Sequence, residues 1–215
     1  MELSLEYKVR EPKILLDKNP LLLLLHGYGS NEDDLFSFAS ELPDEYFVIS
    51  ARAPYDLQYG SYAWYAINFD ADQNKFSDQS QAVLSRDLVV KFLEELKSKF
   101  PIDSSNITLI GFSQGSILSY SIAISYPKIV QRVGALSGYL NLDTTIDNYQ
   151  NNDFSGLKIF SSHGTVDQVI PVELARKTDP ILKSLGINST YEEYPIGHGV
   201  SPQNFYDLKS WLLEK

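Results

Sequence analysis

Apolar residues in this chain form short runs that alternate with segments of helical period. Residues 3–9 read LSLEYKV and alternate apolar with polar side chains, as a half-exposed edge strand does. Residues 21–26 read LLLLLH, a continuous apolar run typical of a strand buried on both faces of a sheet. The same reasoning predicts further strands at these ranges: 46–50, 106–112, 132–137, 157–162 and 189–195.

Helices are predicted between these strands. Ser30 or Asn31 is expected to cap a first helix, because three acidic residues, favoured by the helix dipole, follow at 32–34. Over 77–100, apolar residues recur every four positions with charged residues between them, which predicts a long amphipathic helix. Its predicted apolar face is Leu84, Leu88, Phe92, Leu96 and Phe100, and its predicted polar face includes Arg86, Lys91, Glu94, Glu95 and Lys97. Further helices are predicted over 114–126, 172–185 and 202–215.

The alternation of strand and helix predicts an α/β fold with a doubly wound, mostly parallel sheet. No repeat or linker divides residues 1–215, so we expect a single domain, and no segment between the elements is long enough for a large lid. Ligands of such sheets bind at the carboxyl ends of the strands, which are therefore the positions to inspect.

Composition narrows the function mainly by exclusion. The formal net charge of −10 disfavours nucleic-acid binding and docking on anionic membranes. With no cysteine, the chain has no disulfides, thiolate metal sites or cysteine nucleophile. The first ten residues lack the apolar core of a signal peptide, and the five leucines at 21–25 are far too few to span a bilayer. We therefore expect a cytoplasmic protein without stable membrane association.

The segment GFSQG at 111–115 places Ser113 between two glycines, after a predicted strand and before a predicted helix. A sharp strand-to-helix turn holds its central residue in a strained conformation and exposes the side chain. A Cβ atom at 111 or 115 would collide where the helix crosses the strand, and glycine avoids that collision. Ser113 is thus a candidate nucleophile; the alternative is a serine that only caps the helix.

A serine nucleophile needs a base, and the base needs an anion to orient it. His198 lies between glycines after the last predicted strand, and Asp167 follows the strand at 157–162. The chain order Ser113, Asp167, His198 is the nucleophile, acid, base order of α/β-hydrolases. The alternatives are a solvated loop histidine and a turn-forming aspartate. The rival acids are Asp143, Asp153 and Asp179.

Two further features of the strand ends bear on the chemistry. His26 and His163 each precede a glycine, and we expect both to be structural, since no second ligand accompanies them to make a metal site. The backbone N–H groups of Tyr28 and Gln114 are the expected oxyanion-hole donors. Because these donors are backbone groups, the two side chains are expected to be replaceable without abolishing catalysis.

Four segments carry a resemblance: LLLLHGYGSNEDDL, GFSQGS, HGTVDQVIP and PIGHGVSPQNFYDLKSWL. They resemble the carboxylesterase/phospholipase family of small α/β-hydrolases, related to the acyl-protein thioesterases. The resemblance implies an α/β-hydrolase fold, a triad of Ser113, Asp167 and His198, and hydrolysis of carboxylic ester or thioester bonds. Two positions depart from the pattern: Ser116 stands where a second glycine is frequent, and the GHGV loop differs from the GHS-type ending of the thioesterases.

Residues 53–70 form an aromatic-rich segment. Its position resembles that of the family's acyl-pocket loop, so Trp64 and Tyr65 are hypothesised to line a slot for the acyl chain. The alternative is a surface loop that packs on itself. The aromatic residues are Tyr55, Tyr59, Tyr62, Trp64, Tyr65 and Phe69.

The sequence thus predicts a serine hydrolase that cleaves carboxylic esters with short to medium acyl chains and needs no metal or cofactor. Its partner is a small-molecule ester, and a homodimer is left open. Two alternatives share the triad: a thioesterase or lysophospholipase, and a lactone hydrolase. A third is a non-catalytic protein of the same fold that binds a small ligand.

Overall fold

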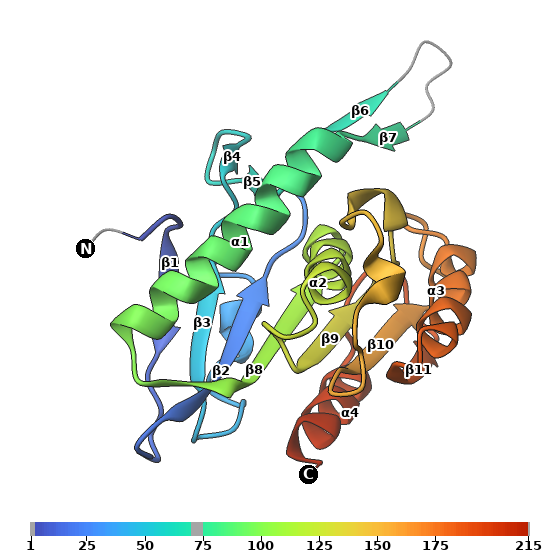
Figure 1. Ribbon diagram of the computed structural model, residues 1–215. Helices are drawn as coiled ribbons and strands as arrows, with labels where there is room; N and C mark the ends of the chain where they lie inside the picture. The colour runs from blue at the N-terminus through green and yellow to red at the C-terminus, as the bar shows by residue number, and fades with distance from the viewer. Residues whose placement is uncertain (1–2, 70–74, 215) are drawn as a thin grey trace.

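A seven-stranded sheet forms the centre of the computed structural model, which describes residues 3–69 and 75–214 (Figure 1). The strand order is β1-β3-β2-β8-β9-β10-β11; β1 pairs antiparallel with β3, and every other neighbouring pair is parallel. This confirms the α/β class and the mostly parallel sheet. The strands are β1 (Tyr7–Arg10), β2 (Asn19–Leu25), β3 (Phe47–Ala51), β8 (Ile102–Phe112), β9 (Arg132–Leu136), β10 (Lys158–Gly164) and β11 (Asn188–Tyr194).

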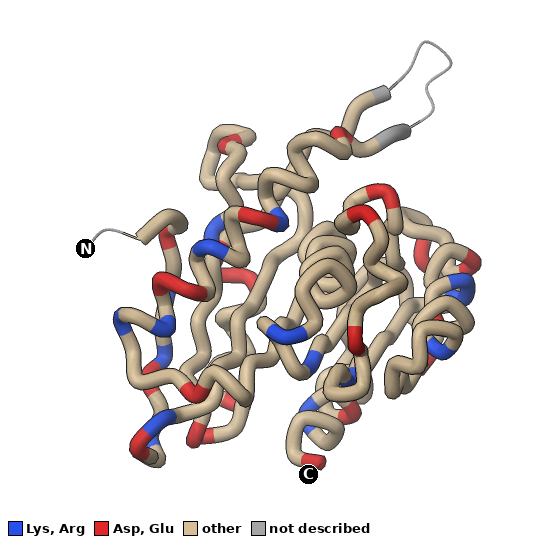
Figure 2. The backbone as a smooth tube through the Cα atoms, in the orientation of Figure 1, with Lys and Arg blue, Asp and Glu red and all other residues tan. Residues whose placement is uncertain are grey.

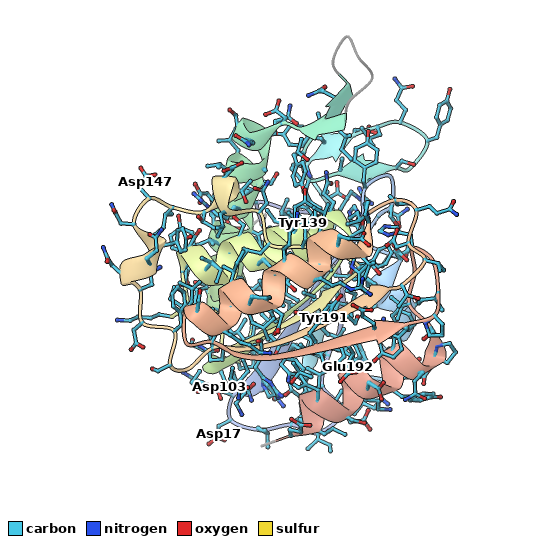
Figure 3. All side chains as sticks on the ribbon, turned by 90° about the vertical axis from the view of Figure 1, so that its right-hand side faces the viewer. Asp17, Asp103, Tyr139, Asp147, Tyr191 and Glu192 are labelled. Atoms are coloured by element: carbon cyan, nitrogen blue, oxygen red, sulfur yellow. The ribbon has the colours of Figure 1, made fainter. Side chains whose placement is uncertain are left out.

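Helices cover both faces of the sheet and give two apolar cores. On one face α1, α2 and α3 pack on the sheet, and on the other η1 and α4 do so. Figure 3 shows this from the β11 edge, with α3 and α4 on opposite sides of that strand. The helices are η1 (Leu35–Phe38), α1 (Gln79–Lys99), α2 (Gln114–Ser125), η2 (Leu142–Thr144), η3 (Tyr149–Asn151), α3 (Val172–Ser184) and α4 (Pro202–Leu213). None of the helices within the described ranges combines the length and apolarity needed to cross a membrane.

Strand β2 has the burial that its apolar run predicts. All seven of its residues are buried. Leu23 and Leu25 belong to the core beneath α1 and α2, whereas Leu22 and Leu24 belong to the core beneath α4. A strand covered by helices on both faces has no solvent side, which is why its sequence does not alternate.

The prediction of a helix that begins at Ser30 or Asn31 is wrong: only the single-turn helix η1 forms shortly after these residues. The backbone of Ser30 instead pairs with Tyr62, and the side chain of Asn31 donates to the carbonyl of Gly60 (2.9 Å). Two of the three acidic residues that suggested a helix start are ion-paired, Glu32 with Arg52 and Asp33 with Lys8. Long-range pairing therefore overrides the local helix signal.

The predicted apolar face of α1 is only partly correct. Leu84 is 63% exposed, whereas Arg86, predicted to be polar and outward, is 4% exposed. The guanidinium of Arg86 donates to the carbonyl of Thr144 (2.7 Å) and pairs with Asp87. Positions four apart drift by about 40° around a helix of 3.6 residues per turn, so a strict four-residue repeat cannot stay on one face. The buried residues are Ala82, Ser85, Arg86, Val89, Phe92, Leu93 and Leu96.

Two small hairpins lie between β3 and α1, and neither was predicted. The first pairs β4 (Tyr55–Asp56) with β5 (Tyr62–Ala63), and the second pairs β6 (Ile67–Phe69) with β7 (Lys75–Ser77). Strands of two or three residues are too short to give a periodic signal. The second hairpin extends from the amino end of α1 beyond the rest of the molecule (Figure 1).

The turn from β8 into α2 has the conformation that its glycines predict. Ser113 has φ 52° and ψ −114°, with a positive φ that residues with a side chain rarely adopt. A Cβ atom on Gly111 would overlap the carbonyl of Gly115, and one on Gly115 would overlap the carbonyl of Leu25 in β2. Both glycines thus let α2 cross the sheet at backbone contact, and the side chain of Ser113 lies at the carboxyl end of the central strands.

Replacement of Gly115 by alanine is expected to destabilise the fold, because backbone atoms of β2 cannot yield to the added methyl group. We expect Gly115→Ala to lower the free energy of unfolding by about 3 kcal/mol, at the upper end of the cost of overpacking a core. Gly156→Ala is the matched control, since nothing lies within 4 Å of its added Cβ. Urea denaturation measures both. Equal midpoints for the two variants would contradict the crossing constraint.

Candidate active site

Three side chains from distant parts of the chain form one hydrogen-bonded row. The hydroxyl of Ser113 lies 2.9 Å from Nε2 of His198, and Nδ1 of His198 lies 2.7 Å from Oδ2 of Asp167. Ser113 follows β8, Asp167 follows β10 and His198 follows β11, so all three lie at the carboxyl ends of parallel strands. The structure therefore brings together all three residues that the sequence singled out.

Asp167 accepts three hydrogen bonds and is itself buried. Its Oδ1 accepts from the amides of Val169 (2.8 Å) and Ile170 (2.9 Å), and its Oδ2 accepts from His198. Burial raises the pKa of this carboxyl, but the hydrogen bonds from His198 and the two amides outweigh burial and hold the pKa below its ordinary value. Asp167 thus both forms a turn, through Oδ1, and orients His198, through Oδ2.

The three rival acids are engaged elsewhere. Asp179 pairs with Lys183, Asp153 accepts from the amide of Ser155, and Asp143 accepts from the side chain of Gln79. Among the hydrogen bonds of the described residues, His198 contacts only Asp167 and Ser113 through its ring. Its imidazole is therefore oriented at one nitrogen and free to act on a hydroxyl at the other.

The loop that carries His198 is fixed by its neighbours. The ring of Phe112 lies 5.0 Å from the imidazole, centroid to centroid. Ser137, the residue after β9, donates from its hydroxyl to the carbonyl of Gly199 (3.2 Å) and has a positive φ of 51°. Sequence reasoning missed Ser137; the only available signal was its place at a strand end.

His26 and His163 hydrogen-bond to loop backbone, as predicted. Nε2 of His163 lies 2.8 Å from the carbonyl of Ile170 and 3.3 Å from Oδ2 of Asp167, so it fastens the loop that carries the carboxylate. Nε2 of His26 accepts from the amide of Ala53 (3.1 Å), which leaves Nδ1 to donate to the carbonyl of Gly27 (2.8 Å). Burial lowers the pKa of His26, which favours this neutral form.

The two expected oxyanion donors, the amides of Tyr28 and Gln114, belong to residues that line the same cavity as Ser113 and His198. Gln114 is the first residue of α2, where an amide has no partner within the helix. Neither amide donates to another group among the hydrogen bonds of residues 3–69 and 75–214. Both are thus available to a ligand atom.

The cavity beside Ser113 has a volume of about 1030 Å³. We use the term apolar wall for the apolar residues that line it at the end of β8, the start of α2, the loop after β10 and the start of α3. We use the term polar wall for the polar residues that line it, which include Asp34, Asp78 and Asp143. No lysine or arginine of the described chain lines it, and acidic residues dominate the loops around that end of the sheet (Figure 2). The apolar wall consists of Phe112, Ile117, Val169, Ile170, Pro171 and Leu174.

Of the two aromatic residues that were hypothesised to line a slot for the acyl chain, Tyr65 lines the cavity and Trp64 does not. Tyr65 lines the cavity, together with Tyr139, which Figure 3 labels. Trp64 is fully buried in the core beneath α1 and α2 and does not line the cavity, because its indole turns inward to the carbonyl of His26 (2.9 Å). Residue 70 and the side chain of Phe69 lie outside the described part of the segment.

Within the described ranges, no group of three or more histidine, aspartate or glutamate side chains is arranged to hold a metal ion. The arrangement instead offers an oriented imidazole, a hydroxyl and two backbone donors around one cavity. Such a set can move a proton from the hydroxyl and stabilise negative charge on a carbonyl oxygen.

Comparison with known proteins gives a consistent picture. The family model described as Phospholipase/Carboxylesterase matches residues 11–214. A probable carboxylesterase, SOBER1-like, from Arabidopsis thaliana is 30% identical over 115 residues, which cover 53% of this chain and 44% of that protein. An acyl-protein thioesterase 1 from Cryptococcus neoformans is 26% identical over 216 residues, which cover 90% of this chain and 91% of that protein. The match thus spans less than half the length of the plant relative.

Solved structures share the fold at low sequence identity. A carboxylesterase from Bacillus cereus is 22% identical with a TM-score of 0.83, over 97% of this chain and 93% of that one. A carboxylesterase from Mesorhizobium loti is 19% identical with a TM-score of 0.84, over 100% and 97% of the two chains. At such identities the likeness concerns the fold.

The lowered pKa of Asp167 makes stability depend on pH. A carboxyl whose folded pKa lies below its unfolded value stabilises the fold above the unfolded pKa, about 3.9, and loses this contribution as pH falls through the folded pKa. Urea midpoints from about pH 7 down to about pH 3 are therefore expected to show wild type and Asp167→Asn converging as pH falls. Asp147→Asn, at an exposed aspartate (Figure 3), controls for the loss of one negative charge. A constant difference between wild type and Asp167→Asn would contradict the assignment.

Proposed function

The chain belongs to the phospholipase/carboxylesterase family, and on this basis we propose that it hydrolyses carboxylic esters or thioesters through an acyl-enzyme on Ser113. Asp167 orients His198, and His198 takes the proton of the Ser113 hydroxyl. The amides of Tyr28 and Gln114 bind the oxyanion. The substrate is a small neutral ester with a short to medium acyl chain.

The observation that carries this proposal is the continuous row from Asp167 through His198 to Ser113. Its two distances, 2.7 and 2.9 Å, are within hydrogen-bond range, and each imidazole nitrogen faces the group that its role requires. The carboxylate accepts the Nδ1 proton, so Nε2 is the unprotonated nitrogen that faces the hydroxyl. A serine that served only as a helix cap would not need this row, and the hydroxyl of Ser113 makes no capping hydrogen bond to α2.

In the acylation step, Oγ of Ser113 attacks the carbonyl carbon of the ester while Nε2 of His198 accepts the hydroxyl proton. The carbonyl oxygen becomes an oxyanion and receives hydrogen bonds from the two amides. Gln114 opens α2, so the helix dipole also favours negative charge at this point. His198 then gives its proton to the leaving alkoxide or thiolate, and the acyl group stays on Ser113.

In the second half, water replaces the leaving group. His198 removes a proton from that water, and the resulting hydroxide attacks the acyl carbon of the ester on Ser113. The second tetrahedral intermediate uses the same amides. It collapses to release the acid as the proton returns from Nε2 to Oγ of Ser113, which restores the starting state.

The two walls of the cavity suggest how the substrate lies. The apolar wall after β10, with Val169 52% exposed and Leu174 36% exposed, offers contact surface to an acyl chain. The polar wall carries three carboxylates and no described cation, so it suits a neutral polar leaving group and disfavours an anionic one. We therefore assign the acyl chain to the loop after β10, and not to Trp64.

Labelling by a fluorophosphonate probe separates this proposal from a non-catalytic ligand-binding protein. Wild type is expected to incorporate one probe per chain at Ser113, and Ser113→Ala is expected to incorporate none and to lose roughly 10⁶-fold in kcat, as a subtilisin-type triad does. The matched control is Ser116→Ala, since Ser116 is buried on the same helix without a hydrogen-bond partner. Full esterase activity in Ser113→Ala would rule out the acyl-enzyme.

The charge of the cavity predicts substrate selectivity. Methyl 4-(butanoyloxy)benzoate, whose leaving group is neutral, is expected to exceed 4-(butanoyloxy)benzoate, whose leaving group carries a carboxylate, by roughly tenfold in kcat/KM, about 1.4 kcal/mol of repulsion from the carboxylates of the cavity. The ratio should shrink in Asp143→Asn and with added salt, because salt screens exposed charges. Lys183→Met, in the last turn of α3 and outside the cavity lining, is a charge-change control. An anionic preference would contradict the proposed leaving-group wall.

A further inference from the structure

Trp64 is fully buried, yet its polar groups are all engaged. Its indole Nε1 donates to the carbonyl of His26 (2.9 Å), the residue that directly follows β2 and precedes the loop of Tyr28. Its carbonyl accepts from the hydroxyl of Ser85. A tryptophan that only filled the core would not need to place its N–H on the backbone of this particular loop.

The side chain of Gln114 holds the backbone of the same tryptophan. Its Oε1 accepts from the amide of Trp64 (2.7 Å), and its Nε2 donates to the carbonyl of Tyr65 (2.7 Å). The side-chain amide of Gln114 therefore accepts from one backbone N–H and donates to one backbone carbonyl, as the backbone of a neighbouring β-strand does. Gln114 is 3% exposed, so no water is at hand to replace these bonds if they are lost.

The loop before α1 is also tied to the Tyr28 loop by main-chain pairing. The amide of Gly29 donates to the carbonyl of Tyr62 (2.9 Å), and the amide of Tyr62 donates to the carbonyl of Ser30 (2.8 Å). Residues 62–65 therefore contact the Tyr28 loop on one side and Gln114 on the other. These contacts connect the residues that carry the two proposed oxyanion donors.

We propose that the side chains of Gln114 and Trp64 are positioning residues that hold the amides of Gln114 and Tyr28 at a fixed separation for the oxyanion. We call this pair the brace. The inference rests on the proposed function, and it revises one expectation from the sequence, that the side chain of Gln114 is dispensable. Neither side chain of the brace touches the oxyanion; each acts through the backbone that it holds.

The expected size of the effect follows from the geometry of the donors. Loss of a whole oxyanion donor costs roughly 10²–10³ in kcat, and a displacement of about 1 Å can cost 10²-fold. Loss of one brace contact leaves both amides present but less well placed. We therefore expect roughly a tenfold loss in kcat for each single variant.

Two variants remove the contacts of the brace and replace each side chain with an apolar one. Trp64→Phe removes the Nε1 donor to His26 but retains an aromatic ring in the core, and Gln114→Met removes both contacts to residues 64 and 65 with a residue that suits a helix. The matched controls are Trp211→Phe, at the only other tryptophan, which packs in the core beneath α4, and Gln81→Met. Gln81 accepts from the amide of Ala66 (2.8 Å), on the same segment but away from the Tyr28 loop.

The measurements separate positioning from stability. For each variant we would measure kcat and KM for p-nitrophenyl butyrate, the thermal midpoint, and the Ki of an alkyl trifluoromethyl ketone, whose adduct with a serine carries an oxyanion. In both brace variants kcat is expected to fall roughly tenfold and Ki to rise roughly tenfold. KM is expected to stay within about twofold. In the double variant the losses should be less than multiplicative, since both act through one connection.

Other results would overturn the brace. If Trp64→Phe and Gln114→Met lower the thermal midpoint but change kcat and Ki no more than the controls do, the contacts only stabilise the fold. If KM rises while kcat and Ki stay as in wild type, the segment shapes the cavity and not the oxyanion hole. Because each variant tests one end of the brace, failure of one to fold leaves the other to decide.

Failure of the brace is distinguishable from failure of the proposed function. Full activity in Ser113→Ala, or a wild type that neither takes up the fluorophosphonate nor binds the ketone, would remove the proposed function and the brace with it. Turnover that depends on Ser113, with ketone affinity unchanged in both brace variants, would remove the brace alone.

Discussion

The contact of α2 with the central strands is the constraint on which the rest of the structure depends. Because Gly111 and Gly115 carry no Cβ, the helix starts directly against the backbone of β8 and β2. This close contact places the strained residue Ser113 at the carboxyl end of the central strands and places Gln114, the first residue of α2, in the lining of the same cavity. It also brings the side chain of Gln114 within reach of residues 64 and 65. If α2 lay farther from the strands, the hydroxyl of Ser113 and the amide of Gln114 would both lie farther from the loop after β2.

Parallel strands then determine which other loops reach that edge. Asp167 and His198 follow β10 and β11, the last two strands at one edge of the sheet. Backbone hydrogen bonds hold their two loops side by side; for example, the amide of Val166 donates to the carbonyl of Ile196 (3.2 Å). His163 adds a buried bond to the carbonyl of Ile170 and thereby limits movement of the carboxylate. The orientation of His198 is thus a property of two adjoining loops, and not of the histidine's own sequence neighbours.

What the sequence could predict follows from the range of the interactions involved. The strands, the main helices and the residues at strand ends depend on local periodicity and on the rule that parallel strands end at one edge, so β2 and the row of Ser113, Asp167 and His198 could be predicted. The predicted helix at Ser30 or Asn31 does not form, because residues 20 and 32 positions away pair with its groups: Arg52 with Glu32, and Tyr62 with Ser30. The inward turn of Trp64 was also unpredictable from composition, since an aromatic residue gives the same signal whether it faces a cavity or the core.

Because Trp64 faces the core, the residues that position the proposed oxyanion donors differ from those that form the proposed acyl-chain surface. Residues 62–65 use their polar groups on the loop of Tyr28 and on Gln114, whose amides are the proposed oxyanion donors. The proposed acyl-chain surface comes instead from the loop after β10 and the start of α3, where Val169 and Leu174 are partly exposed. A side chain on an exposed loop can change without disturbing packing, whereas one in a dense interior cannot. In the proposed mechanism, substitutions after β10 would therefore alter which acyl chain fits while the two proposed oxyanion donors keep their separation.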